Sequence, residues 1–236
     1  MHTSNYIYQH GTQELHGYLA YDDKVKGKKP AVIVAHDWTG RNPFACEKAE
    51  KLAELGYVGF ALDMYGQGRL GSTNDEKSVL MQPLMADRQL LRARVCAAFE
   101  VVSALPEVDA TRIAIIGFCF GGLCALDLAR SGVPLKGAVS FHGLLKKPEG
   151  LPVLPIKARV LALHGYDDPM VRPNDLESFA QEMTEASVDW QLHAYGNTQH
   201  AFTNPLAHDT ALGLQYNKLA DQRSWIAMRN FLQEVL

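Results

Sequence analysis

The sequence lacks any long apolar run, and it has no excess of positive charge. None of its hydrophobic stretches approaches the roughly 20 residues that a membrane-spanning helix needs. The 26 acidic and 23 basic side chains leave a formal net charge of −3, which argues against a nucleic acid or an anionic membrane as partner. No cationic segment followed by an apolar core opens the chain, so we expect no signal peptide and a cytoplasmic location.

Cysteine is also scarce, and its copies follow no disulfide pattern. The chain has four cysteines in 236 residues, as expected for free thiols in a reducing compartment. Cys119 and Cys124 are five positions apart, so they do not form the C-x-x-C motif of a redox pair. No spaced set of His and Cys has the pattern of a metal site, and we expect no bound metal.

Internal repeats, low-complexity segments and linkers are absent too, and the length suits a single domain over residues 1–236. Apolar runs of strand length alternate with segments of helical periodicity, which predicts an α/β fold: a mostly parallel central sheet with helices on both faces. The expected strands are two antiparallel edge strands within 6–21, then 31–35, 57–62, 113–116, 137–141, 159–163 and 188–194. The expected helices are 44–55, two within 75–105 that are interrupted near Pro83, one after residue 121, 176–186 and 212–236.

One stretch carries the strongest functional signal. A β-branched run ends at Gly117, and Cys119 follows between two phenylalanines, with Gly121 and Gly122 opening a helix pattern. This is the G-x-S-x-G nucleophile elbow of the α/β-hydrolase fold with cysteine in place of serine. The glycines are needed because strand and helix nearly touch at the turn. A glycine-rich turn with a merely buried cysteine is the alternative.

The expected partners of Cys119 occur in the order nucleophile, acid, histidine. Asp168 follows the strand 159–163, and His200 lies in the last loop before the final helix. Asp167 is a rival for the acid, but the spacing from Gly165 favours Asp168. Both segments follow strands, and the carboxyl ends of parallel strands meet at one edge of the sheet, so we expect a Cys119–His200–Asp168 triad there.

The loop after the strand 31–35 supplies further candidates. An oxyanion hole needs two N–H donors, and we expect them from the backbones of Phe120 and Trp38. Asp37 lies in the same loop, either as an acid beside the thiol or as a residue that orders the loop. Three more histidines follow strands, and we expect structural hydrogen bonds from them; they are His36, His142 and His164.

With these residues placed, the chain resembles the dienelactone hydrolase family over nearly its whole length. The resemblance rests on the segments 34–40, 56–66, 117–122, 164–168 and 200–202. It implies the α/β-hydrolase fold, the triad on Cys119, Asp168 and His200, and no metal or organic cofactor.

The chain departs from the family pattern at positions that bear on the substrate. Asp37 stands where the family's lactonases have glutamate, and the neutral Asn204 stands where they have an arginine that grips a substrate carboxylate. The candidates for a second such arginine are Arg69, Arg88, Arg92 and Arg94. The residues expected to bind the substrate are Asn204, Arg88, Tyr65 and Phe202.

These observations predict a monomeric, cofactor-independent hydrolase of small-molecule lactones or esters that works through a thioester on Cys119. A general carboxylesterase or thioesterase with the same triad is an alternative. A non-catalytic ligand-binding protein of the same fold is a second alternative, from another functional class.

Overall fold

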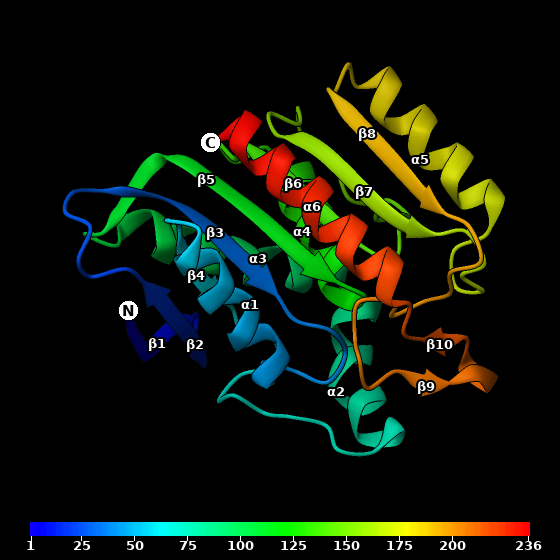
Figure 1. Cartoon of the computed structure of the whole chain (residues 1–236), viewed down its shortest axis with the longest axis horizontal. Helices are drawn as coiled ribbons and strands as arrows, with labels where there is room; N and C mark the ends of the chain where they lie inside the picture. The colour runs from blue at the N-terminus through cyan, green and yellow to red at the C-terminus, as the bar shows by residue number, and fades with distance from the viewer.

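The computed structural model describes residues 1–236, which form a twisted eight-stranded sheet with helices on both faces (Figure 1). The strand order is β1-β2-β4-β3-β5-β6-β7-β8. β1 and β2 pair antiparallel, β2 pairs antiparallel with β4, and every other neighbouring pair is parallel. The strands span His2–His10, Gln13–Tyr21, Lys29–Ala35, Val58–Ala61, Val108–Phe118, Gly137–Phe141, Arg159–Gly165 and Trp190–Tyr195. The predicted α/β fold is therefore confirmed.

The central strands are apolar throughout because both of their faces are covered. In β3, Ile33 packs into a core on one face of the sheet, and Val32 and Val34 pack into a second core on the other face. All three are fully buried. This is why the sequence shows a continuous apolar run there and alternation only in the edge strands.

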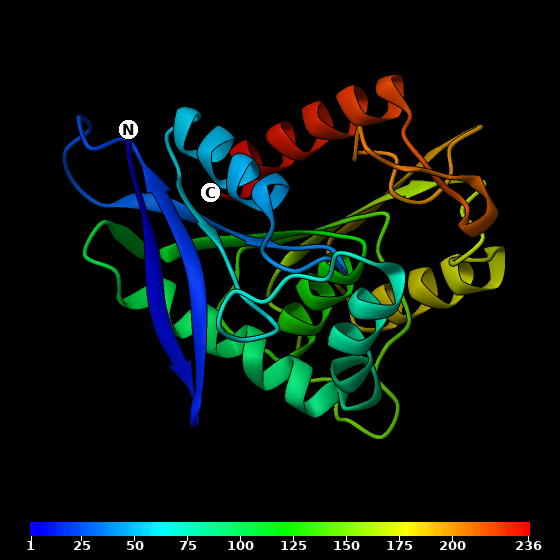
Figure 2. The same cartoon turned by 90° about the horizontal axis from the view of Figure 1, so that it is seen from below.

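The helices cover the sheet from two sides. In Figure 2, α1 (Pro43–Glu54) and α6 (Lys218–Val235) lie above the sheet, and α3 (Arg88–Ala104) and α4 (Phe120–Arg130) lie below it. The outer part of the sheet is closed by α5 (Pro173–Glu185), whose Phe179 and Met183 join a third apolar cluster with β7.

The break between the two helices of the segment 75–105 lies later than predicted. α2 runs through Pro83 over Asn74–Ala86, and α3 starts again after Asp87. Pro83 removes only one backbone donor, and both Pro83 and Val79, whose carbonyl loses its partner, are exposed to water. Asp87 defines the break because its side chain accepts the Leu90 N–H and caps α3.

The prediction that the last helix begins at residue 212 is wrong. Residues 208–215 form a small hairpin of β9 (His208–Asp209), a 3₁₀ turn (Thr210–Leu212) and β10 (Leu214–Gln215). α6 begins only at Lys218, where the side chain of Asn217 caps it. This hairpin reaches back toward the carboxyl edge of the sheet, where the predicted functional residues also lie (Figure 1).

No helix of the structure is both long enough and apolar enough to cross a membrane.

Candidate active site

Cys119 lies at the junction of β5 and α4, at the carboxyl edge of the sheet. Its backbone has φ +55° and ψ −116°, a conformation that a side-chain-bearing residue adopts only when its surroundings hold it. Its N–H donates to the Phe141 carbonyl at 3.0 Å, and its carbonyl accepts the Gly122 N–H at 2.9 Å. The strained turn is therefore anchored on both sides, with Cys119 at the apex.

The three glycines of the elbow are required by space. A Cβ on Gly117 would overlap the Gly121 carbonyl, and a Cβ on Gly121 would overlap the Ala35 carbonyl of β3. A Cβ on Gly122 would lie 2.5 Å from the Ser140 Oγ. Because glycines allow the backbones to approach this closely, α4 starts directly after β5. The unpaired N–H groups of its first turn therefore lie beside the thiol.

Asp168 and His200 are joined by a buried hydrogen bond. The His200 Nδ1 lies 2.7 Å from the Asp168 Oδ2, and both side chains are almost fully buried. The other carboxylate oxygen of Asp168 accepts the Met170 N–H at 2.8 Å, which fixes its orientation. Its rival Asp167 is exposed.

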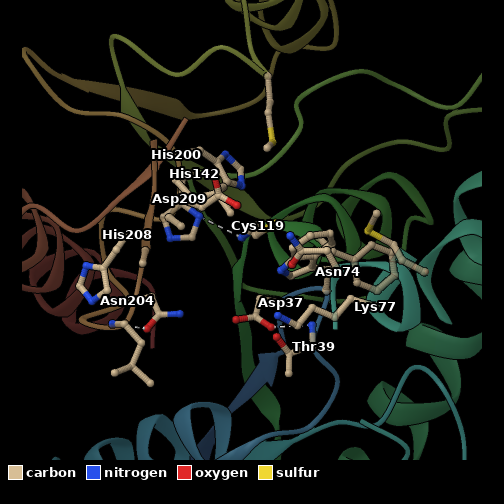
Figure 3. Close-up of a pocket in the computed structure, with 18 of the residues that line it drawn as sticks. Asp37, Thr39, Asn74, Lys77, Cys119, His142, His200, Asn204, His208 and Asp209 are labelled. Atoms are coloured by element: carbon tan, nitrogen blue, oxygen red, sulfur yellow. Dashed lines mark hydrogen bonds between the residues drawn. The ribbon is translucent and has the colours of Figure 1, made fainter. Parts of the chain in front are cut away.

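The second nitrogen of His200, Nε2, is buried and has no hydrogen-bond partner. His200 and Cys119 line the same cavity (Figure 3). Burial favours the neutral ring, but the neighbouring Cys119 side chain and the hydrogen bond to the Asp168 carboxylate outweigh it and raise the pKa of His200 to about 10. The arrangement thus favours the imidazolium form of His200.

The loop after β3 carries the second expected oxyanion donor. Trp38 N–H makes no hydrogen bond within the loop, and Phe120, the first residue of α4, has no acceptor for its N–H inside the helix. The Tyr65 hydroxyl donates to the Trp38 carbonyl at 2.9 Å and holds this loop in place. Asp37 accepts the Thr39 N–H at 2.8 Å, as a loop-ordering residue would, and it also lines the cavity.

The cavity above Cys119 has a volume of about 670 Å³. Its wall includes residues that the sequence did not single out. Asn74 and Lys77 reach it from the first turns of α2, on the side opposite His208 and Asn204 (Figure 3). The Lys77 Nζ lies 5.2 Å from the centre of the Trp38 ring. A Thr-x-x-Glu capping box at 73–76 marks the start of α2 in the sequence. It does not indicate which side of the helix points toward the cavity.

A continuous stretch of the wall comes from the hairpin. The hairpin contributes His208, Asp209, Thr210, Ala211 and Leu214, and the two residues before it, Leu206 and Ala207, extend this part of the wall. Residues 206–211 were assigned no element from the sequence, and residues from 212 on were predicted as helix, so this part of the wall was missed.

Of the four residues expected to bind the substrate, only Asn204 lines the cavity. The buried Tyr65 instead supports the Trp38 loop, with its ring stacked on Phe120. Phe202 is fully buried and packs against the His142 ring. These positions correct the expectation of direct substrate contact for Tyr65 and Phe202.

Arg88 likewise lies outside this cavity. Its guanidinium pairs with the buried Asp127 at 2.7 Å and donates to the Lys146 carbonyl. A smaller cavity of about 210 Å³ lies beside it. The expected contact between Arg88 and a substrate carboxylate beside Cys119 is therefore corrected, because a carboxylate of the protein already holds this arginine.

The other histidines at the strand ends differ from one another. His36 donates from Nδ1 to the Asp37 carbonyl and accepts the Met64 N–H on Nε2, as predicted for a structural residue. His142 also makes two hydrogen bonds. His164 makes none with either ring nitrogen, which corrects the prediction for that residue. No group of His, Cys, Asp and Glu side chains is arranged to hold a metal ion.

A cysteine elbow, a buried Asp–His pair and a parallel sheet together place the chain in the α/β-hydrolase fold class, and solved structures support this. A structure named m3DLH superposes with a TM-score of 0.92 at 41% identity and covers 100% of this chain and 98% of its own. A dienelactone hydrolase-like promiscuous phosphotriesterase from metagenomic libraries superposes with a TM-score of 0.94 at 37% identity, over 99% and 98% of the two chains.

The family model for the dienelactone hydrolase family matches residues 15–236, and the chain belongs to this family. A Bradyrhizobium protein named as a probable 2-oxo-3-(5-oxofuran-2-ylidene)propanoate lactonase is 29% identical over 85% of this chain and 82% of its own. A Yersinia pestis protein provisionally named carboxymethylenebutenolidase is 30% identical over 80% and 74%. The chain is accordingly a carboxylic ester hydrolase with a small-molecule ester or lactone as substrate, as predicted.

Proposed function

We propose that the protein hydrolyses lactones and activated esters through a thioester on Cys119, with His200 as acid–base catalyst and Asp168 as the residue that orients it. The observation that carries this proposal is the buried Asp168–His200 hydrogen bond of 2.7 Å, with the free Nε2 of His200 in the same cavity as the thiol. A free thiol is only slightly ionised at neutral pH, so catalysis needs such a base.

The proposed reaction is acyl transfer. His200 takes the proton of the Cys119 thiol, the resulting thiolate attacks the carbonyl carbon, and the N–H groups of Phe120 and Trp38 receive the oxyanion. The tetrahedral intermediate collapses to a thioester as the C–O bond breaks, and the imidazolium of His200 gives its proton to the leaving oxygen. His200 then takes a proton from water, the hydroxide displaces the thiolate, and a carboxylic acid leaves.

The choice of sulfur predicts which substrates are favoured. A thiolate is a good leaving group, so the first intermediate reverts when the alcohol leaves poorly. Enol and aryl esters are therefore expected to be hydrolysed faster than alkyl esters. Equal rates on both kinds of ester would contradict this mechanism.

The test is hydrolysis of an aryl ester and of a dienelactone by wild type and Cys119→Ala, before and after treatment with iodoacetamide. Loss of both activities with the substitution and with the reagent supports Cys119 as nucleophile, whereas activity in Cys119→Ala refutes it. The ratio of the two rates distinguishes a lactonase from a general carboxylesterase or thioesterase. Inactivity together with slow labelling of Cys119 would favour a ligand-binding protein.

Phosphotriester hydrolysis is a second candidate function. It is supported by the 37% identity to the promiscuous phosphotriesterase over 99% of this chain. An aryl dialkyl phosphate added to the same panel tests it, and release of the aryl group by wild type but not by Cys119→Ala would support it.

A further inference from the structure

His142 is a buried histidine that the proposed reaction does not use. It follows β6 directly, with φ +39°, and only 2% of it is exposed. Its side chain nevertheless lines the cavity beside Cys119 (Figure 3). A residue other than glycine held at positive φ next to a reactive thiol needs an explanation.

The ring of His142 connects two segments that are distant in the sequence. On one side, its Nδ1 lies 3.1 Å from the backbone nitrogen of Cys119, whose N–H is shared with the Phe141 carbonyl. On the other side, its Nε2 lies 2.8 Å from the Oγ1 of Thr203, three residues beyond His200.

These two contacts define one tautomer. Because an N–H of Cys119 points at Nδ1, that nitrogen is an acceptor, and the ring proton is on Nε2, which donates to Thr203. A second ring proton would face a donor and would break the contact with Cys119. His142 is therefore neutral, with a fixed orientation.

We propose that His142 is a positioning residue that sets the Cys119 thiol and the His200 ring at their working distance and orientation. This rests on the function proposed above for Cys119 and His200. Cys119 follows β5, whereas the loop that carries His200 and Thr203 follows β8, at the far edge of the sheet. The His142 ring bridges the two segments directly, and its centroid is 5.1 Å from that of His200, in an edge-on arrangement.

The surroundings keep His142 uncharged while His200 carries a charge. Burial holds the pKa of His142 well below its usual value, and the nearby cationic groups act in the same direction. The groups whose charges act on it are His200 from the loop, Lys48 from α1 and His164 from the end of β7. His142 can therefore keep its hydrogen bonds while His200 exchanges its proton.

The experiment removes the hydrogen bond between His142 and Thr203 by substituting one partner or the other. Thr203→Val keeps the volume and loses the acceptor, whereas His142→Asn keeps an acceptor for the Cys119 N–H and is too short to reach Thr203. Thr198→Val is the matched control, because Thr198 is equally buried in the same loop but bonds to Gly196 and Asn217 instead. The readouts are kcat and KM for an aryl ester and the pH dependence of Cys119 inactivation by iodoacetamide.

We expect Thr203→Val and His142→Asn each to lower kcat by about tenfold to a hundredfold, since a misplacement of about 1 Å has effects of this size. KM is expected to change by less than about threefold. The pH midpoint of inactivation is expected to move in both variants but not in Thr198→Val. The double variant is expected to be no worse than the poorer single variant, because both substitutions break the same link.

The proposal is overturned if the two variants melt at a lower temperature but keep the wild-type kcat and the wild-type inactivation profile, since His142 would then only fill space. Should His142→Asn fail to fold, Thr203→Val alone decides between these outcomes. Failure of the proposed function looks different: it appears as ester hydrolysis that survives Cys119→Ala, whatever happens at His142.

Discussion

The substitution Asp168→Asn tests the proposed role of this carboxylate, which is to orient the ring of His200. The Asp168 Oδ1 accepts the Met170 N–H at 2.8 Å, so an asparagine is expected to keep its oxygen there. Its amide nitrogen would then face His200 Nδ1, where the carboxylate lies at 2.7 Å in the wild type. The imidazole would have to accept at Nδ1 and carry its proton on Nε2, where it cannot take a proton from the thiol.

The size of the expected fall in kcat follows from the loss of the hydrogen bond between Asp168 and His200 and of the correct His200 tautomer. A buried hydrogen bond to a charged group contributes about 1.5–3 kcal/mol, and a base in the wrong tautomer has cost about 10⁴ in kcat in a triad of this kind. We expect kcat for an aryl ester to fall by about 10³–10⁴ in Asp168→Asn, with KM little changed. The exposed Asp167 provides the control, and Asp167→Asn is expected to keep wild-type kcat.

The same variant changes how stability depends on pH. His200 has a raised folded-state pKa of about 10, so its protonation stabilises the fold fully below about pH 6.5 and the contribution is lost as the pH rises toward 10. Without the Asp168 carboxylate, the folded-state pKa falls, so the contribution is smaller and has vanished at a lower pH than in wild type. Thermal melts at pH 7 and pH 9 measure this. A full kcat in Asp168→Asn, or a loss confined to Asp167→Asn, would refute the assignment.

Three further substitutions test other parts of the site. Tyr65→Phe removes the donor to the Trp38 carbonyl and is expected to lower kcat about tenfold with KM unchanged; a raised KM with normal kcat would instead indicate that Tyr65 contacts the substrate. Lys77→Met is expected to raise KM about tenfold for esters that bear a carboxylate and to leave neutral esters unaffected, and equal effects on both would exclude a charge contact. Gly121→Ala places a Cβ 2.6 Å from the His36 carbonyl and is expected to destabilise the fold by several kcal/mol; a melting temperature close to that of wild type would show that the elbow can relax.

The parts of the site that could be predicted are those that a short segment of sequence determines by itself. The elbow needs small residues at 117, 121 and 122 because the backbones touch there, so its position can be read directly. Asp168 and His200 follow strands, and parallel strands bring their carboxyl ends together whatever the residues between them. These rules fix which backbone segments meet at this edge.

The missed residues depend on side-chain directions and on a small hairpin with weak sequence signals. The start of α2 has a clear capping signal, but only tertiary packing decides that Lys77 faces the cavity. The second half of the hairpin, residues 212–215, was predicted as the start of the last helix. Two signals pointed the other way: Gly213, with φ +71°, and Asn217, which caps α6. Arg88 was proposed from the family resemblance, and the sequence does not show that Asp127 already pairs with it.

The hairpin 208–215 has a consequence for how this protein can diversify. It forms part of the cavity wall, yet the Gly213 carbonyl accepts the N–H of His200, and the Gln215 N–H donates to the carbonyl of His200. A Cβ on Gly213 would also press on the Pro169 ring, next to Asp168. Insertions and sequence drift can therefore accumulate at the tip, around Thr210, and alter which molecules are accepted. The base at 213–215 must stay constant, so selectivity can evolve in this protein without moving the histidine.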